Sequence, residues 1–176
     1  MRFQELSVPG VFAVLIEPVN DDRGFFARTW SAADFAAHGL NPNLVEISVS
    51  FNPQPGTLRG MHFQAAPHEE AKLVRCTRGA IFDVAVDVRP ASSAFRHWAG
   101  LELTAENGQA LYVPEGCAHG FITLVPDTEV LYQISHPHAP GSAGGVRWDD
   151  PEFDIEWPRQ PAVMSQRDRD FPDFTR

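Results

Sequence analysis

The chain has little cysteine and no long hydrophobic run. Only two of its 176 residues are cysteines. Cys76 and Cys117 each lie in or beside an apolar segment, so we expect small buried side chains in a reducing compartment rather than a disulfide. No apolar run approaches the roughly 20 residues that a membrane-spanning helix needs. Residues 1–5 lack the apolar core of a secretory signal peptide, which predicts a cytoplasmic protein that is not exported.

Basic residues are too few for a nucleic-acid-binding protein. Lysine and arginine number 14, against 23 aspartates and glutamates, and the formal net charge is -9. Proteins that bind nucleic acids need a broad basic face to neutralise phosphates, so the composition argues against that class. A nucleotide ligand is compatible with this charge, because a few arginines inside a pocket can bind a diphosphate.

The chain has little helical pattern, and several catalytic patterns are missing. The sequence contains no glycine-rich phosphate-binding loop, no serine nucleophile elbow and no CxxC pair. One short helix is expected, with Ser31 as its N-cap and its end at Gly39.

What the chain does contain is a two-residue periodicity within a length that fits one domain over residues 1–176. In residues 80–89 the apolar positions share one strand face, and Asp83 and Asp87 share the other, which we expect to be the wetter one. Many short strands with so little helix predict an all-β fold, either a sandwich or a closed barrel. The strand candidates are residues 11–16, 25–30, 45–51, 58–64, 73–76, 80–89, 98–103, 110–113, 120–124 and 129–135.

Two segments place a histidine shortly after a turn residue. Gly56 is followed by five residues and then His62, and Gly108 precedes a proline-glycine turn that ends near His119. This spacing is similar to that of the two signature motifs of a cupin β-barrel. Metal-binding cupins have a second histidine where this chain has Gln64. The difference favours acid–base catalysis over metal catalysis.

A metal site is the second interpretation of these residues. His62 and His119 would supply two imidazoles, and Glu69 or Glu70 a carboxylate. Two histidines and one carboxylate can bind Fe(II). Gln64 is a poor replacement for a ligand, so we expect no metal and no other cofactor.

Three further polar residues could join the histidines. Lys72 lies in an apolar stretch, where it either meets an anion or extends its ammonium into water. Tyr132 is either a core aromatic or a phenol that points into a cavity. Strict alternation puts Arg59 on the strand face opposite His62, so Arg59 can join His62 only through a bulge or twist at Gly60.

Together these segments resemble the dTDP-4-dehydrorhamnose 3,5-epimerases, the RmlC-like branch of the cupins. The resemblance implies a cupin jelly-roll barrel, a homodimer, and cofactor-free proton transfer on a nucleotide-linked 4-keto-6-deoxysugar. It runs over nearly the whole chain in matching order and spacing, through residues 22–26, 58–64, 71–75, 83–89, 118–121, 148–151 and 165–168.

The resemblance also implies catalytic roles. A ketone at C4 acidifies the protons at C3 and C5 of the sugar. His62 would be the base, and Asp168, supplied by a tail over residues 159–176 that packs back, would orient and charge its imidazole. Lys72 would stabilise the enolate oxygen, and Tyr132 would return a proton from the opposite face.

Substrate contacts are implied as well, chiefly to phosphates, from Arg23, Arg59 and His119. Elsewhere the chain departs from the family pattern at positions expected to contact substrate: Arg28 replaces glutamate, Glu46 and Ser48 replace glutamine and asparagine, His138 replaces a tyrosine that stacks on the base, Ala143 replaces an acidic residue and Arg167 replaces lysine.

These departures leave three alternatives open. The chain could be a divergent 3-epimerase or 5-epimerase for another deoxysugar, or a metal-dependent cupin enzyme that uses His62 and His119. It could also be a silent sugar-nucleotide-binding module, although retention of His62 and Tyr132 argues against mere binding.

Overall fold

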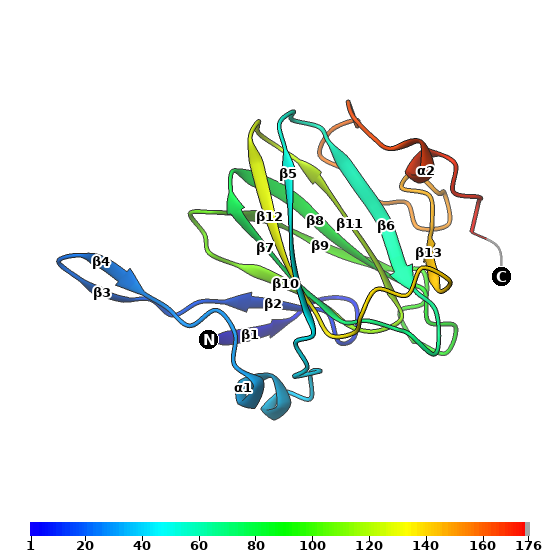
Figure 1. Cartoon of the computed structure of the whole chain (residues 1–176). Coiled ribbons are helices and arrows are strands. Elements are labelled where there is room, and N and C mark those ends of the chain that lie inside the picture. The colour runs from blue at the N-terminus through cyan, green and yellow to red at the C-terminus, as the bar shows by residue number, and fades with distance from the viewer. Residues whose placement is uncertain (175–176) are drawn as a thin grey trace.

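The two-residue periodicity becomes two antiparallel sheets in the computed structural model, which describes residues 1–174 (Figure 1). The six-stranded sheet has the order β1 (Arg2–Glu5), β2 (Phe12–Leu15), β10 (Ala110–Val113), β7 (Lys72–Arg78), β12 (Thr128–Ile134) and β5 (Glu46–Asn52). The five-stranded sheet has the order β13 (Ala143–Gly145), β6 (Leu58–Gln64), β11 (Cys117–Thr123), β8 (Ala80–Asp87) and β9 (Trp98–Thr104). The expected all-β cupin fold is confirmed.

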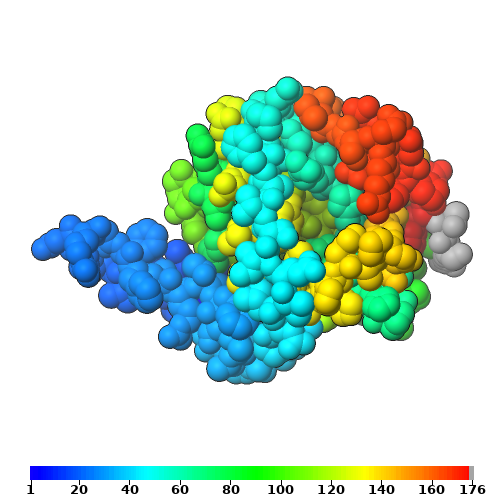
Figure 2. All heavy atoms as spheres, viewed as in Figure 1, coloured from blue at the N-terminus to red at the C-terminus, as the bar shows by residue number. Residues whose placement is uncertain are grey.

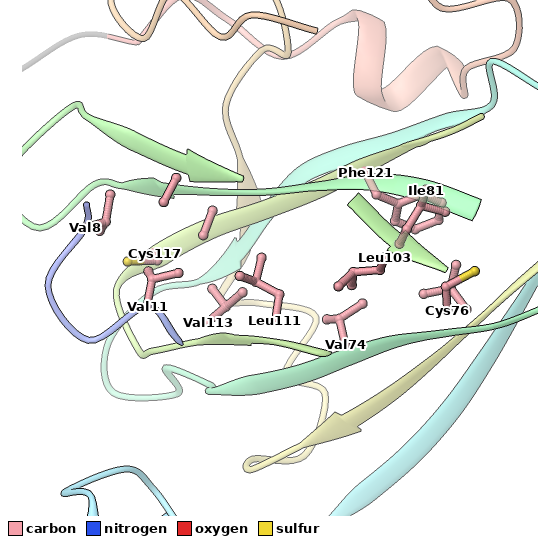
Figure 3. Close-up of a cluster of buried hydrophobic side chains, with 13 residues drawn as sticks. Val8, Val11, Val74, Cys76, Ile81, Leu103, Leu111, Val113, Cys117 and Phe121 are labelled. Atoms are coloured by element: carbon pink, nitrogen blue, oxygen red, sulfur yellow. The ribbon is translucent and has the colours of Figure 1, made fainter. Parts of the chain in front are cut away.

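Apolar side chains from both sheets meet between them (Figure 3). Val74 and Leu111 come from the six-stranded sheet, and Ile81 and Phe121 from the five-stranded sheet. All four are at most 1% exposed. Burial of such side chains contributes roughly 1.5–3 kcal/mol each, which makes this cluster the main attachment of one sheet to the other.

Strand β8 is buried on both faces, so the expectation of a wetter face was wrong. Its apolar face packs against Phe153, and Val84 and Val86 on that face are fully buried. Its polar face lies inside the barrel, where Asp83 and Asp87 are both 0% exposed. Alternation correctly separated the two faces. The aspartates of the polar face are paired with Arg89 and His119 instead of being solvated by water.

The helix predicted from Ser31 is confirmed as α1 (Ala32–Ala37). The Ser31 hydroxyl accepts a hydrogen bond from the backbone N–H of Asp34, and Gly39 has the left-handed φ of +72° that suits glycine after a helix. A second helix, α2 (Gln166–Arg169), was not predicted.

A short hairpin of β3 (Val19–Asp21) and β4 (Gly24–Phe26) stands away from the barrel (Figure 1, Figure 2). We call this hairpin the arm. The strand expected over residues 25–30 is therefore wrong beyond Phe26, because the chain leaves its partner strand there. The arm exposes three large apolar side chains: Val19 at 71%, Phe25 at 64% and Phe26 at 78%.

Both cysteines, Cys76 and Cys117, are free and buried as expected. Within residues 1–174, no helix has the length and apolar character to cross a membrane.

Candidate active site

A cavity of about 630 Å³ opens between the two sheets. Strands β5, β7 and β12 line one side, β6 and β11 the other, and residues 163–168 its mouth. The cavity collects most of the polar residues expected from sequence: Ser48, Arg59, His62, Lys72, His119, Tyr132, Arg167 and Asp168.

His62 and Asp168 form a close pair in this cavity. The imidazole Nε2 lies 2.7 Å from Asp168 Oδ1, and Oδ2 of the same carboxylate accepts the backbone N–H of Gly60 at 3.3 Å. Ser165 caps helix α2 and thereby fixes Asp168, which is 3% exposed. Burial opposes ionisation of Asp168, but hydrogen bonds from His62 and Gly60 outweigh it and lower its pKa. The pair is therefore a carboxylate that orients an imidazole.

Gly60 explains how Arg59 reaches the same cavity as His62. The pairing of β6 with β11 shifts register here, which confirms the bulge that alternation required. Gly60 has a φ of +146°, and a Cβ there would lie 2.6 Å from the Cα of Gly120. Only glycine fits both conditions. Arg59 then turns its guanidinium toward Asn52, with Nε donating to Oδ1 at 2.8 Å.

Lys72 is directed inward. Its Nζ lies 2.8 Å from Glu70 Oε1, and both side chains are 10% exposed. The same ammonium lies 3.5 Å from the carbonyl oxygen of His62. The alternative in which Lys72 extends into water is wrong, and the structure supplies a carboxylate partner that sequence reasoning considered only as a metal ligand.

Tyr132 also points into the cavity. Its hydroxyl lies 3.3 Å from Ser50 Oγ, and its burial raises its pKa above the ordinary value. A phenol in this setting keeps its proton at neutral pH, which suits a proton donor.

His119 belongs to a second histidine–aspartate pair. It lies directly across from His62 in the pairing of β11 with β6. Its Nε2 is 2.7 Å from Asp83 Oδ1, and its ring meets that of Tyr132 edge to face at 6.2 Å. Burial raises the pKa of Asp83, although His119 and Lys72 oppose the effect. Sequence reasoning missed the role of Asp83. Alternation placed it on the polar face of its strand but could not identify His119 as its partner.

The remaining expected substrate contacts lie in or beside a side hollow, on the arm, or just after the arm. His138 and Ala143 line a hollow of about 190 Å³ that shares His62, Lys72 and Arg167 with the cavity. Glu46 Oε1 accepts the backbone N–H of His138 at 3.3 Å.

Two arginines lie away from the cavity of their own chain. Arg23 sits on the arm, pairs with Asp21 at 2.5 Å, and its side chain is 89% exposed. Arg28 follows the arm and lies 4.0 Å from Asp34.

The alternative metal ligands do not converge. Among residues 1–174, no group of three or more His, Cys, Asp and Glu side chains could hold a metal ion. Each of the two cavity histidines directs Nε2 at an aspartate. Gln64 is occupied by the backbone, since its Oε1 accepts the N–H of Ala139 at 2.6 Å.

Comparison with known proteins agrees with this geometry. Residues 5–176 match the family model described as dTDP-4-dehydrorhamnose 3,5-epimerase. The chain belongs to this family. It is 42% identical over 173 residues to the dTDP-4-dehydrorhamnose 3,5-epimerase of Sinorhizobium fredii, covering 98% of this chain and 89% of the relative.

Solved structures of epimerase family members have the same fold. The dTDP-4-dehydrorhamnose 3,5-epimerase of Elizabethkingia anophelis superposes with a TM-score of 0.95 at 33% identity, over 99% of this chain and 96% of that one. The enzyme of Bacillus anthracis, solved with TDP and PPi bound, gives a TM-score of 0.94 at 36% identity, over 98% of this chain and 99% of that one.

Proposed function

We propose that this protein epimerises a nucleotide-linked 4-keto-6-deoxysugar of the dTDP-4-dehydrorhamnose type by cofactor-free proton transfer. The observation that carries the proposal is the arrangement of His62 and Tyr132. An imidazole oriented by a carboxylate and a protonated phenol line the same cavity but come from opposite sheets. Inversion of a carbon centre needs a base and an acid on opposite faces.

The reaction begins with removal of a proton beside the C4 ketone. His62 accepts that proton from C3 or C5, and the negative charge of Asp168 stabilises the resulting imidazolium. Electrons of the broken C–H bond move to the C4 oxygen and form an enolate. The Lys72 ammonium stabilises this oxyanion electrostatically, because a cation is aimed at the charge that develops there. Tyr132 then delivers a proton to the opposite face of the carbon.

Cationic and hydrogen-bonding groups nearby suit a diphosphate. Arg59, Arg167 and His119 are donors on the cavity wall, and Ser48 adds a hydroxyl. His138, beside Glu46 and the small Ala143, gives the side hollow an aromatic ring that can stack on a base, with less area than a tyrosine.

A homodimer completes the proposal. The arm exposes apolar side chains, and strand β5 exposes three more: Ile47 at 61%, Val49 at 56% and Phe51 at 48%. Exposed apolar surface of this kind marks an interface. A second copy would cover it and would bring Arg23 of the arm, and Arg28 just after the arm, to the cavity of its partner. The reducing compartment suited to free Cys76 and Cys117 is the cytoplasm.

Deuterium exchange tests the proposed reaction. dTDP-4-keto-6-deoxyglucose is incubated with the protein in D₂O and followed by NMR. We expect deuterium at C3, C5 or both, and the labelled positions separate a 3,5-epimerase from a 3-epimerase or 5-epimerase. Absence of exchange from a folded protein, across several nucleotides, would reject the proposal. A stoichiometric bound metal whose removal abolishes exchange would instead favour the metal-dependent alternative.

A further inference from the structure

One aromatic side chain touches the proposed base from outside the cavity. The ring of Phe171, three residues after Asp168 in the chain, meets the His62 ring edge to face, with 6.0 Å between the ring centroids. Phe171 is half-buried and lines neither the cavity nor the side hollow. It therefore contacts the imidazole away from the space that a substrate would fill.

A glycine directly across from His62 makes room for this ring. Strand β13 pairs with β6 so that Gly145 lies opposite His62. A Cβ at Gly145 would lie 2.2 Å from Phe171 Cζ, so a larger residue there would displace the ring. The guanidinium of Arg167 lies over the ring, 5.8 Å from its centroid. Phe171 is thus packed between a strand backbone, an arginine and the proposed base.

The segment that carries Phe171 is held at both of its ends. Helix α2 precedes it and packs against β6 (Figure 1). After it, the backbone N–H of Phe174 donates to Asp150 Oδ2 at 2.6 Å. The Phe174 ring packs against that of Phe153, with 5.0 Å between the centroids. These contacts limit how far the Phe171 ring can move.

The hydrogen bond to Asp168 leaves one motion of His62 free. It holds a single ring nitrogen, Nε2, and the ring can still tilt about that point. The side chain of His62 is 39% exposed, so the cavity side offers the ring little packing. Misplacement of a reacting group by about 1 Å can cost about 10²-fold in rate. The contact with Phe171 restricts the tilt that the hydrogen bond permits.

We propose that Phe171 is a positioning residue that fixes the tilt of the His62 imidazole and so directs its second ring nitrogen at the substrate carbon. The inference rests on the proposed function for the role of His62 as the base. Asp168 holds one nitrogen, and Phe171 sets the plane in which the other lies. One short segment, residues 168–171, therefore aligns the base from two sides.

The first test needs no substrate. Carbon-13 relaxation NMR of the histidine rings measures the amplitude of ring motion, with His62 assigned by comparison with His62→Gln. We expect a rigid His62 ring in the wild-type protein and larger ring motion in Phe171→Leu, which removes the aromatic edge but stays apolar. If Phe171→Leu does not fold, Phe171→Met takes its place, because methionine fills irregular space. A ring already mobile in the wild type, or equally rigid in the variant, would overturn the inference.

Kinetics then separate this role from substrate binding. Phe171→Leu should lower kcat by about 10-fold and change KM by less than about threefold, because the ring acts on the base and not on the bound substrate. Deuterium incorporation and inversion should fall together, since removal of the proton by His62 precedes both. A loss confined to KM would mean that the ring acts through Arg167, and it would overturn the inference.

Phe95→Leu is the matched control. Phe95 is also half-buried and also lies beneath an arginine, with Arg96 5.2 Å from its centroid. It packs against the same tail through Phe174, with 5.9 Å between the centroids, but does not line the cavity. This variant should lower the midpoint of thermal unfolding and leave kcat and the motion of the His62 ring unchanged.

The control also decides between positioning and a general loosening of the tail. An equal fall of kcat in Phe95→Leu and Phe171→Leu would show that any weakened contact of the tail produces it, which would overturn the assignment. If the wild type turns over no 4-keto sugar while the motion of the His62 ring still depends on Phe171, the proposed function fails and the positioning of the ring stands.

Discussion

The two sheets that enclose the cavity contribute different chemistry. The five-stranded sheet supplies imidazoles backed by carboxylates, with His62 on β6 and His119 on β11. The six-stranded sheet supplies an ammonium and a phenol, Lys72 on β7 and Tyr132 on β12. In the proposed reaction, one sheet removes the proton and the other returns it. A sandwich with a cavity between its layers thus provides two opposed faces.

The largest expected effect comes from removing the proposed base, His62, of the five-stranded sheet. His62→Ala should reduce turnover by about 10³- to 10⁴-fold, near the upper end for a general base, because His62 is the cavity imidazole that Asp168 orients. The measurement is the rate of deuterium incorporation at C3 and C5. His97→Ala, at an exposed position outside the cavity, is the control and should keep full activity. Unchanged incorporation in His62→Ala would eliminate the base assignment.

Removing the proposed acid, Tyr132, of the six-stranded sheet should separate exchange from inversion. Tyr132→Phe leaves His62 intact, so we expect deuterium to enter with retention while the epimerised product falls by about 10²-fold. The chain has one other tyrosine, Tyr112, whose hydroxyl accepts the backbone N–H of Asn41 at 2.9 Å. Tyr112→Phe should cost about 1 kcal/mol of stability and leave inversion unchanged. Equal loss of exchange and inversion in Tyr132→Phe would contradict the division of labour between the sheets.

A smaller effect concerns the free energy of unfolding and tests whether an ionised Asp168 pairs with His62. The native fold lowers the pKa of Asp168, so its ionised form stabilises the protein above the ordinary carboxylate pKa of about 4. That contribution is lost as the pH falls through the lower native value. Asp168→Asn should therefore be about 2 kcal/mol less stable than the wild type at pH 7, and the difference should shrink toward pH 3. Urea unfolding at the two pH values measures it; a constant difference would argue against an ionised Asp168.

The smallest expected effect is the thiol reactivity of the two cysteines, which lie in the packed core between the sheets and not in the cavity. Burial raises the pKa of Cys76 to about 11 and that of Cys117 to about 12. Because the thiolate is the reactive form, neither should react with a thiol reagent at pH 8 until the protein unfolds. Denaturant titration with absorbance detection of the released reagent anion checks this. Rapid labelling of the native protein would show that the core opens.

Periodicity predicted the strands well but could not place every residue in space. The bounds of β6 and β10 agree with the residues expected from sequence, and so does the bulge at Gly60. Alternation divided β8 into two faces, yet it could not tell that both are covered, and so Asp83 was missed. Strands β1, β3 and β13 were also missed; β3 and β13 have only three residues each, which give too little alternation to recognise.

The candidate site depended more on the family resemblance than on local pattern. Asp168 lies 106 positions from His62 in the chain, and no local rule joins them. Its placement follows from the packing of α2 against β6, a tertiary contact. The ion pair of Lys72 with Glu70 is closer in sequence, but strand geometry alone leaves open which way the lysine turns.

The arm has a genetic consequence. If Arg23 acts in the cavity of a partner subunit, then mutations at Arg23 and His62 damage different sites of the same dimer. Two variants inactive alone, Arg23→Ala and His62→Ala, would complement one another when co-expressed. Random pairing would restore about a quarter of the sites, because half the dimers are mixed and each mixed dimer has one intact site. An arm mutation would then inactivate the cavity of the partner subunit and leave the cavity of its own chain intact.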